Sequence, residues 1–362
     1  MTATPISGPY THEKSSISRT MIWVMVALTP ATVFGIYQFG LPALWLFVIT
    51  ILASILTEAV CLSIAGKPVK TYLFDGSAIL TGWLLAMTLP PWAPWWIAVV
   101  GVLLAIVVGK HVFGGIGQNL FNPAMVARVA LLISFPLEMT TWVAPHPLFS
   151  EITPDFIESL RITFNLQNEF DAVSSATILG HIKTELGRGL SLNEIWLDTF
   201  SPLNFAVGTV AGSLGETSAV LILAGGLVLL FTGIISWHIP VSMMLSIAVL
   251  ATVFHWIDPN HYPHALYHLL SGATLLGAFF IATDLVTSPV TKKGQLLFGA
   301  GCGALVFIIR SWAGYPEGMA FAVMLMNGFT PMIDHYIKPR IYGRTRKGDP
   351  ISYSSEVEST ND

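Results

Sequence analysis

Long apolar runs recur along almost the whole chain, and they constrain its fold more than any other feature. A helix needs roughly 20 mostly apolar residues to cross the hydrocarbon layer of a membrane. About ten runs approach that length, at 20–38, 41–66, 74–89, 95–111, 124–143, 218–237, 239–256, 265–283, 295–312 and 318–336. Charged residues make up only 10% of the chain, against about 25% in soluble proteins. The sequence therefore predicts an all-α polytopic membrane protein and excludes an ordinary soluble enzyme.

The basic residues indicate which side of the membrane each connection occupies, because Lys and Arg resist export. With the N-terminus inside, twelve of the 17 basic residues fall in inside segments, at Lys14, Arg19, Lys67, Lys70, Lys110, Lys292, Lys293, Lys338, Arg340, Arg344, Arg346 and Lys347. The stretch 139–216 holds nine acidic residues but only Arg161, Lys183 and Arg188 as basic ones. We therefore expect both termini in the cytoplasm and one large loop on the outer side.

This topology divides the chain into five segments. They are a cytoplasmic N-terminal tail at 1–19, a first group of five helices at 20–138, the outer loop at 139–216, a second group of five helices at 217–337, and a basic and then polar cytoplasmic tail at 338–362. No small-residue cleavage site follows the first apolar run, so we expect that run to be a retained span and not a secretory signal.

The two halves of the chain resemble each other. At an offset of 195, Ala78, Leu80, Gly82 and Thr88 fall on Ala273, Leu275, Gly277 and Thr283, and at an offset of 200 Lys110 falls on Arg310. Each half holds five spans, an odd number, so the second half begins on the opposite side and the repeats are inverted. The third and eighth spans contain Gly and Pro at their ends, which is typical of half-helices that flank a binding site in such folds.

A short polar string in the outer loop points to the chemistry. It spans 171–177 and reads DAVSSAT; by itself it indicates only a turn, because Asp and Ser side chains bond nearby amides. The string resembles the flavinylation sequence D-x-x-[ST]-x-A-T, in which the last threonine carries FMN through a phosphoester bond. The resemblance implies covalent FMN on Thr177, with Asp171 and Ser174 as supporting residues of the motif.

Other motifs extend this resemblance over the chain from residue 7 to residue 344. They are SGPYTH at 7–12, NPA at 122–124, LSGAT at 270–274 and FFIATD at 279–284. Together they resemble the D subunit of the Rnf-type electron transport complex, which is related to the B subunit of sodium-translocating NADH:quinone reductase. The resemblance implies a flavin-carrying subunit of a translocase-type oxidoreductase in the bacterial inner membrane. Such a complex couples electron transfer of the NADH and ferredoxin type to movement of Na⁺ or H⁺, and the outer loop is then periplasmic.

The resemblance also implies partners and a second cofactor. The partners are the other membrane and peripheral subunits of the complex, and a flavin transferase for maturation. That enzyme has to activate the threonine, a weak nucleophile, and to supply a metal for the phosphates. A non-covalent riboflavin within the helix bundle is implied as well. No Cys or His spacing predicts a metal site on this chain, and 17 basic against 21 acidic residues leave no surface for nucleic acid.

A second string, at 271–274, reads SGAT and is nearer to the core of the flavinylation sequence than the outer-loop string is. His268 stands three residues before it, where the motif has an aspartate. The string also opens the eighth apolar span, where a transferase does not reach a buried threonine. We therefore expect FMN on Thr177 and not on Thr274.

Four residues in or beside the spans are candidates for an ion pathway or for contact with a second flavin: Glu58, Asp75, Asn122 and Asp284. Asn122 before a proline is also typical of a helix cap. Arg128 and Arg310 fall inside or at the edge of spans, where a charge is costly unless it is paired or reaches the interface.

Two other functions fit the same spans. A small-solute permease or channel with a urea-transporter-like inverted repeat would use the half-helices to line a pore. A structural membrane anchor for redox partners would need neither a pore nor a flavin. Covalent flavin on Thr177 separates the redox function from both.

Overall fold

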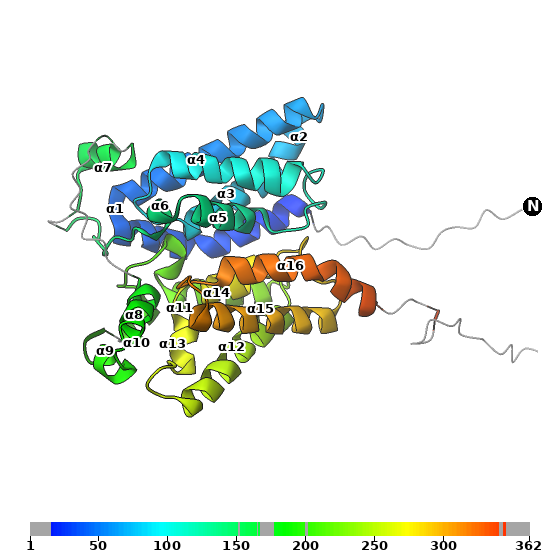
Figure 1. Ribbon diagram of the computed structural model, residues 1–362. Coiled ribbons are helices and arrows are strands. Elements are labelled where there is room, and N and C mark those ends of the chain that lie inside the picture. The colour runs from blue at the N-terminus through cyan, green and yellow to red at the C-terminus, as the bar shows by residue number, and fades with distance from the viewer. Residues whose placement is uncertain are drawn as a thin grey trace, which may run out of the picture.

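The computed structural model describes residues 16–150, 153–164, 166, 177–199, 202–339 and 343–344, and these residues form helices and connections without a β-strand. The first lobe in Figure 1 holds α1 (Ile17–Ile64), α2 (Val69–Leu73), α3 (Ser77–Thr88), α4 (Trp95–Leu103), the π-helix η1 (Leu104–His111), α5 (Pro123–Ser134) and α6 (Pro136–Thr140). The second lobe holds α11 (Ala219–Phe231), α12 (His238–Ile257), α13 (Ala265–Leu270), α14 (Thr274–Leu276), the π-helix η3 (Gly277–Ile281), α15 (Lys292–Trp312) and α16 (Met319–Tyr336).

Short helices connect the two lobes and lie at one end of them. They are α7 (Phe156–Thr163), α8 (Ile178–Gly187), α9 (Leu192–Thr199), α10 (Pro202–Val207) and the 3₁₀-helix η2 (Leu214–Glu216). Figure 1 shows α8, α9 and α10 beside α13 of the second lobe, whereas α7 lies beside the first. The predicted outer loop is therefore largely helical in its described part.

The first two predicted spans form two helices, labelled together as α1, which meet at Gly40, where the chain reverses direction. Gly40 has a φ of +76°, a conformation that glycine adopts without steric cost. The two arms, 17–39 and 41–64, return to the same end of the molecule (Figure 1), and Ser18 Oγ donates a hydrogen bond to the Phe74 carbonyl at 3.4 Å. At 1.5 Å per residue each arm is about 35 Å long, which is enough to cross a hydrocarbon core of about 30 Å.

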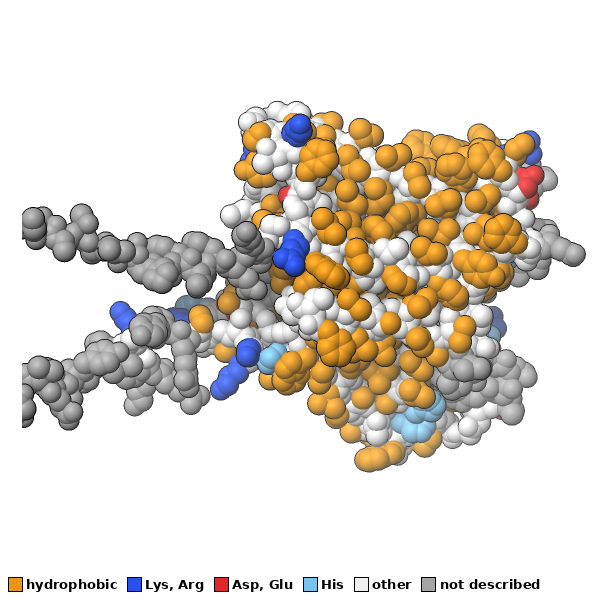
Figure 2. Space-filling model, turned by 180° about the vertical axis from the view of Figure 1, so that it is seen from behind, with side chains coloured by type: hydrophobic (Ala, Val, Ile, Leu, Met, Phe, Trp, Pro, Cys, Tyr) orange, Lys and Arg blue, Asp and Glu red, His pale blue; other side chains and the backbone are white. Residues whose placement is uncertain are grey.

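Apolar helices and an apolar surface place the protein in a membrane. By length and composition α1, α12 and α15 are able to span one, and shorter apolar helices occupy Ser77–Thr88, Trp95–His111, Pro123–Ser134 and Ala219–Phe231. Figure 2 shows hydrophobic side chains across the body of the molecule with only scattered charged ones. Leu56, Leu245 and Leu297 are among the exposed large apolar residues. A continuous apolar surface of this kind suits contact with lipid. The predicted helical, polytopic class is confirmed.

Two predicted spans are interrupted. The run 124–143 ends as a helix at Ser134, because Pro136 disfavours the α conformation at Phe135, whose φ and ψ are −131° and 61°. The run 265–283 is divided into α13, α14 and η3, and Gly272 between them has a φ of +64°. Both runs are mostly apolar on either side of these breaks, so hydropathy alone does not reveal them.

Helices α12 and α15 pack closely because glycines of α15 admit the backbone of α12. A Cβ atom on Gly299 would meet Ser242 Oγ and, at 2.6 Å, the Ile239 carbonyl oxygen. A Cβ atom on Gly303 would meet the Met243 carbonyl oxygen. Small residues allow membrane helices to approach in this way.

We expect Gly299→Val to lower the melting temperature of the detergent-solubilised protein, because overpacking a close helix contact costs about 1–3 kcal/mol. Scanning fluorimetry of the purified variant measures the change. Gly314→Ala is the matched control, since no atom lies within 4 Å of a Cβ built there. Equal melting temperatures for Gly299→Val and the unmodified protein would contradict the close packing.

Candidate functional site

Thr177 begins helix α8. Its Oγ1 accepts a hydrogen bond from the Gly180 backbone N–H at 3.1 Å, and its own backbone is extended, with φ −60° and ψ 150°. The first N–H groups of a helix lack partners within the helix and favour a negative charge beside them. A phosphoester on Thr177 therefore suits the position. The motif residues Asp171 and Ser174 lie outside the described residues.

Thr177 is largely buried, with 8% of its surface exposed. Leu179 and Ile182 of α8 pack in a small apolar cluster with Leu192 and Tyr267, which fixes the helix against α9 and α13. The sequence predicts Thr177 in a large outer loop, and the structure shows it at the start of a helix that packs against α9 and α13. A transferase has to reach the Thr177 hydroxyl before this turn docks, or has to displace it.

A cavity adjoins Thr177. Its lining includes Arg128 of α5, Trp142 beyond α6, Glu216 of η2 and Glu317 before α16. In the connection that precedes α11, burial and the neighbouring Glu317 raise the pKa of Glu216 to about 7. The cavity thus combines aromatic, basic and acidic groups next to the predicted attachment point.

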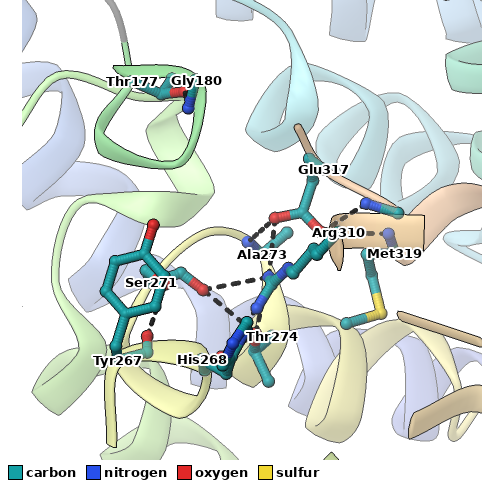
Figure 3. Close-up of polar contacts among 11 residues, drawn as sticks. Thr177, Gly180, Tyr267, His268, Ser271, Ala273, Thr274, Arg310, Glu317 and Met319 are labelled. Atoms are coloured by element: carbon teal, nitrogen blue, oxygen red, sulfur yellow. Dashed lines mark hydrogen bonds and ion pairs between the residues drawn. The ribbon is translucent and has the colours of Figure 1, made fainter. Parts of the chain in front are cut away.

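Thr274, the second threonine considered as an acceptor, is fully buried in a polar network around Arg310 (Figure 3). Arg310 Nη2 donates to Thr274 Oγ1 at 2.9 Å and to Glu317 Oε2 at 2.8 Å. The Thr274 hydroxyl in turn donates to the His268 carbonyl at 2.9 Å. Its oxygen is enclosed by protein groups and has no surface from which another enzyme attacks it.

Glu58 forms a buried ion pair in the first lobe. Lys110 Nζ lies 2.8 Å from Glu58 Oε1 and donates to Ser77 Oγ, also at 2.8 Å. His111 Nε2 lies 3.1 Å from Glu58 Oε2. The side chains of Glu58 and Lys110 are each only 3% exposed. The candidate intramembrane carboxylate therefore has a basic partner, and Lys110, which the charge count places among cytoplasmic residues, lies inside the helix bundle.

Asn122 and Asp284 line a second cavity together with Lys110 and Ser77. Asn122 also caps α5, because its Oδ1 accepts from the Ala124 backbone N–H at 3.1 Å. The structure thus brings Asn122 and Asp284, two of the four polar candidates, together at one cavity. Glu58 is connected to this cavity through its ion pair with Lys110.

The other two acidic candidates of the spans have local roles. Asp284 Oδ2 accepts from the Thr287 hydroxyl at 3.0 Å. Asp75 Oδ1 accepts from the Ser77 backbone N–H at 2.7 Å, just where α3 begins, and lies outside the lining of the second cavity.

Sequence reasoning did not identify Lys110, Trp142 or Glu216 as site residues. For Lys110 a signal exists, since it matches Arg310 in the internal repeat and both residues contact the first turn of a short helix. Trp142 and Glu216 belong to no recognisable motif. Only the folded chain brings them to Thr177.

The helices and the apolar surface define a polytopic membrane protein. Residues 4–343 match the NQR2, RnfD, RnfE family, so the chain belongs to that family. It is 52% identical over 351 residues to the D subunit of the ion-translocating oxidoreductase complex of Halorhodospira halophila, over 97% of this chain and 98% of the relative. The protein of the same name from Stutzerimonas stutzeri is 53% identical over 338 residues, which cover 93% of this chain and 95% of the relative. The one from Rhodobacter capsulatus is 51% identical over 306 residues, which cover 84% of this chain and 85% of the relative. The family resemblance that the motifs indicate is confirmed.

Proposed function

We propose that this chain is the D subunit of an ion-translocating oxidoreductase complex in the bacterial inner membrane, and that it carries FMN by a phosphoester on Thr177. Both termini lie in the cytoplasm and the loop with Thr177 lies in the periplasm. Electrons of the NADH and ferredoxin type pass through other subunits, and the complex moves Na⁺ or H⁺ as they flow. The observation that carries the proposal is the place of Thr177, which caps the start of α8 beside a cavity whose wall includes Arg128, Trp142 and Glu216.

The chain's own residues have two tasks at this site. The N-terminal N–H groups of α8 stabilise the charge of the phosphoester. The cavity walls, with Arg128, Trp142 and Glu216, would hold the ring of the cofactor and tune its electronics, and the bound flavin would supply the electron-transfer chemistry. A transferase attaches the flavin, as the motif implies.

The second cavity is the site that we assign to a non-covalent riboflavin. Phe279 and Phe280 supply flat apolar surface, and Lys110, Asn122 and Asp284 supply polar groups at its wall. Pockets that combine an apolar lining with a few placed polar groups are typical of cofactor sites.

We also propose that the chain crosses the membrane ten times as two inverted five-helix repeats. The two long arms of α1 support two crossings in the first lobe. A related contact in both lobes supports the repeat: Lys110 reaches Ser77 at the start of α3, and Arg310 reaches Thr274 at the start of α14.

We expect the purified protein, co-expressed with its transferase, to give a flavin-fluorescent band at 39.2 kDa on a denaturing gel. Thr177→Val removes the only hydroxyl to which the phosphoester attaches, so this variant should give a dark band at the same expression level. Thr274→Val is the matched control and should stay fluorescent. A dark band for the unmodified protein would refute covalent flavin and favour the permease alternative, which a solute-flux assay in vesicles then tests.

A further inference from the structure

His268 has a buried side chain whose two ring nitrogens have no hydrogen-bond partner among the described residues. It lies on α13 with 3% of its surface exposed, and neither Nδ1 nor Nε2 takes part in a hydrogen bond there. The ring packs edge-on against Tyr267 and Phe307, at centroid distances of 5.3 and 5.4 Å. Buried polar side chains in native proteins almost always have a partner, so one without a partner indicates a bound ion or molecule.

A third cavity adjoins His268. It lies between α8, the connection before α13 and the end of α15, and its wall includes Lys183, His261, His268 and Arg310. The described residues of this wall include no aspartate or glutamate. Neither Lys183 nor Arg310 lines the cavity beside Thr177 or the one beside Asn122. A wall with basic and imidazole groups but without an acidic one suits an anion.

The two permanent cations of this wall differ in their contacts. Lys183 Nζ donates to four backbone carbonyls at the end of α15, within 309–315, and no ion pair of the described residues includes it. Arg310 pairs with Glu317 through Nη2 at 2.8 Å, and its Nη1 donates to the backbone carbonyl of His268 (Figure 3). Arg310 Nε is buried and has no partner among the described residues. The wall therefore holds one ammonium charge without a carboxylate and one guanidinium donor without an acceptor.

We propose that this cavity binds the phosphate group of a ligand, with the Arg310 Nε–H and a ring N–H of His268 as its donors. Phosphate oxygens are strong acceptors, and a guanidinium and an imidazole are groups that bind them. The Lys183 charge attracts the phosphate through space, because the hydrogens of its Nζ are already used by carbonyls. The inference stands apart from the covalent flavin, since it uses neither Thr177 nor its cavity.

The surroundings of the cavity indicate where the phosphate comes from. Tyr262 of the wall packs with Phe254 and Trp312, at centroid distances of 5.3 and 6.2 Å, and Trp256 is 77% exposed close by on α12. Aromatic residues gather in this way at the membrane–water interface, the depth at which lipid headgroups lie. The wall that α8 contributes is mainly apolar, with Leu179, Ile182 and Leu186. The phosphate is therefore either a free ion or the headgroup phosphate of an anionic lipid, and the recognition is the same.

We expect inorganic phosphate to bind the purified, lipid-depleted protein in detergent, measured by isothermal titration against chloride at equal ionic strength. His268→Phe should weaken this binding at least tenfold. Without phosphate the variant should be as stable as the unmodified protein or more so, because the histidine side chain gives up no hydrogen bond. His268→Gln keeps a polar donor and should retain part of the binding. His335→Phe, at an exposed position at the end of α16, is the matched control and should bind phosphate like the unmodified protein.

A second arm of the experiment distinguishes a lipid from a free ion. The protein is reconstituted in vesicles of phosphatidylcholine and phosphatidylglycerol, and native mass spectrometry then counts the phosphatidylglycerol that stays bound. Phosphatidylglycerol retained by the unmodified protein and lost from His268→Phe supports the site with a lipid as its ligand. Titration with inorganic phosphate that depends on His268 supports the site with a free ion as its ligand.

Two results overturn the inference: neither probe binds, or both bind His268→Phe as strongly as the unmodified protein. If His268→Phe does not fold, hydrogen exchange of the unmodified protein decides. Phosphate or phosphatidylglycerol should then slow exchange of the backbone amides at 261–268, and unchanged exchange there overturns the inference. None of these measurements needs a flavin, so a dark band on the denaturing gel refutes the proposed function without changing their outcome.

Discussion

Replacing Glu58 with leucine is expected to reduce the free energy of unfolding by about 3–5 kcal/mol, because it leaves a buried ammonium without its counter-charge. Lys110 Nζ lies 2.8 Å from Glu58 Oε1, and both side chains are 3% exposed. Ser77 Oγ, at 2.8 Å, remains as a neutral partner but does not offset the charge. Denaturant titration of the protein in detergent micelles measures the loss.

The double variant Glu58→Leu with Lys110→Met tests the cause. Replacing both partners of a buried ion pair by apolar residues of similar volume is often neutral or stabilising, whereas removing one is costly. We therefore expect the double variant to recover most of the stability, so that the two substitutions are strongly non-additive. Two results would contradict a stabilising ion pair in the folded bundle: a single variant as stable as the unmodified protein, or a double variant no more stable than the single variant.

Lys110 also lines the cavity that we assign to riboflavin, so the double variant serves the stability comparison alone.

The sequence predicted a helix wherever a run of apolar residues by itself determines where the helix lies. The arms of α1 on either side of Gly40 and the long helices α12 and α15 follow directly from their apolar runs. The end of α5 at Ser134 does not, because the run stays apolar while Pro136 changes the backbone before it. Breaks caused by one residue's backbone preference are hidden when the neighbouring residues keep the same hydropathy.

The candidate site was predictable only in part. Thr177 is found through a motif of contiguous residues, and Asn122 through its cap and its proline. Arg128 is visible as a charge in a span, but its approach to Trp142 and Thr177 depends on how α5, α6 and α8 pack. A single sequence does not show which residues far apart in the chain meet in the fold. It therefore predicts the attachment point, Thr177, and not the residues that line the cavity beside it.

Replacing Arg310 with methionine is expected to cost at least as much as the loss of Glu58, because one guanidinium connects several buried groups. Arg310 Nη1 donates to the His268 carbonyl at 2.8 Å, and Nη2 donates to Ser271 O, Thr274 Oγ1 and Glu317 Oε2 at 3.2, 2.9 and 2.8 Å. Each acceptor left without a donor in a buried place costs about 1–3 kcal/mol, and more where it is charged. The interruption of the helix at Gly272 depends on these hydrogen bonds, since Arg310 donates to backbone carbonyls that have no partner within α13.

Arg310→Lys distinguishes charge from geometry at this point. An ammonium keeps the attraction to Glu317 but lacks the planar fork that reaches His268 and Thr274 together, so we expect an intermediate stability. Arg188→Met, which removes an exposed pair, should change the free energy of unfolding by less than about 1 kcal/mol. If Arg310→Met unfolds at the same denaturant concentration as Arg188→Met, the network of Figure 3 does not stabilise the break between α13 and α14. If Arg310→Lys is as unstable as Arg310→Met, the planar guanidinium geometry and not the charge stabilises the start of α14. Lys110, which has a charge but no planar group, then stabilises the start of α3 in the first lobe in a different way.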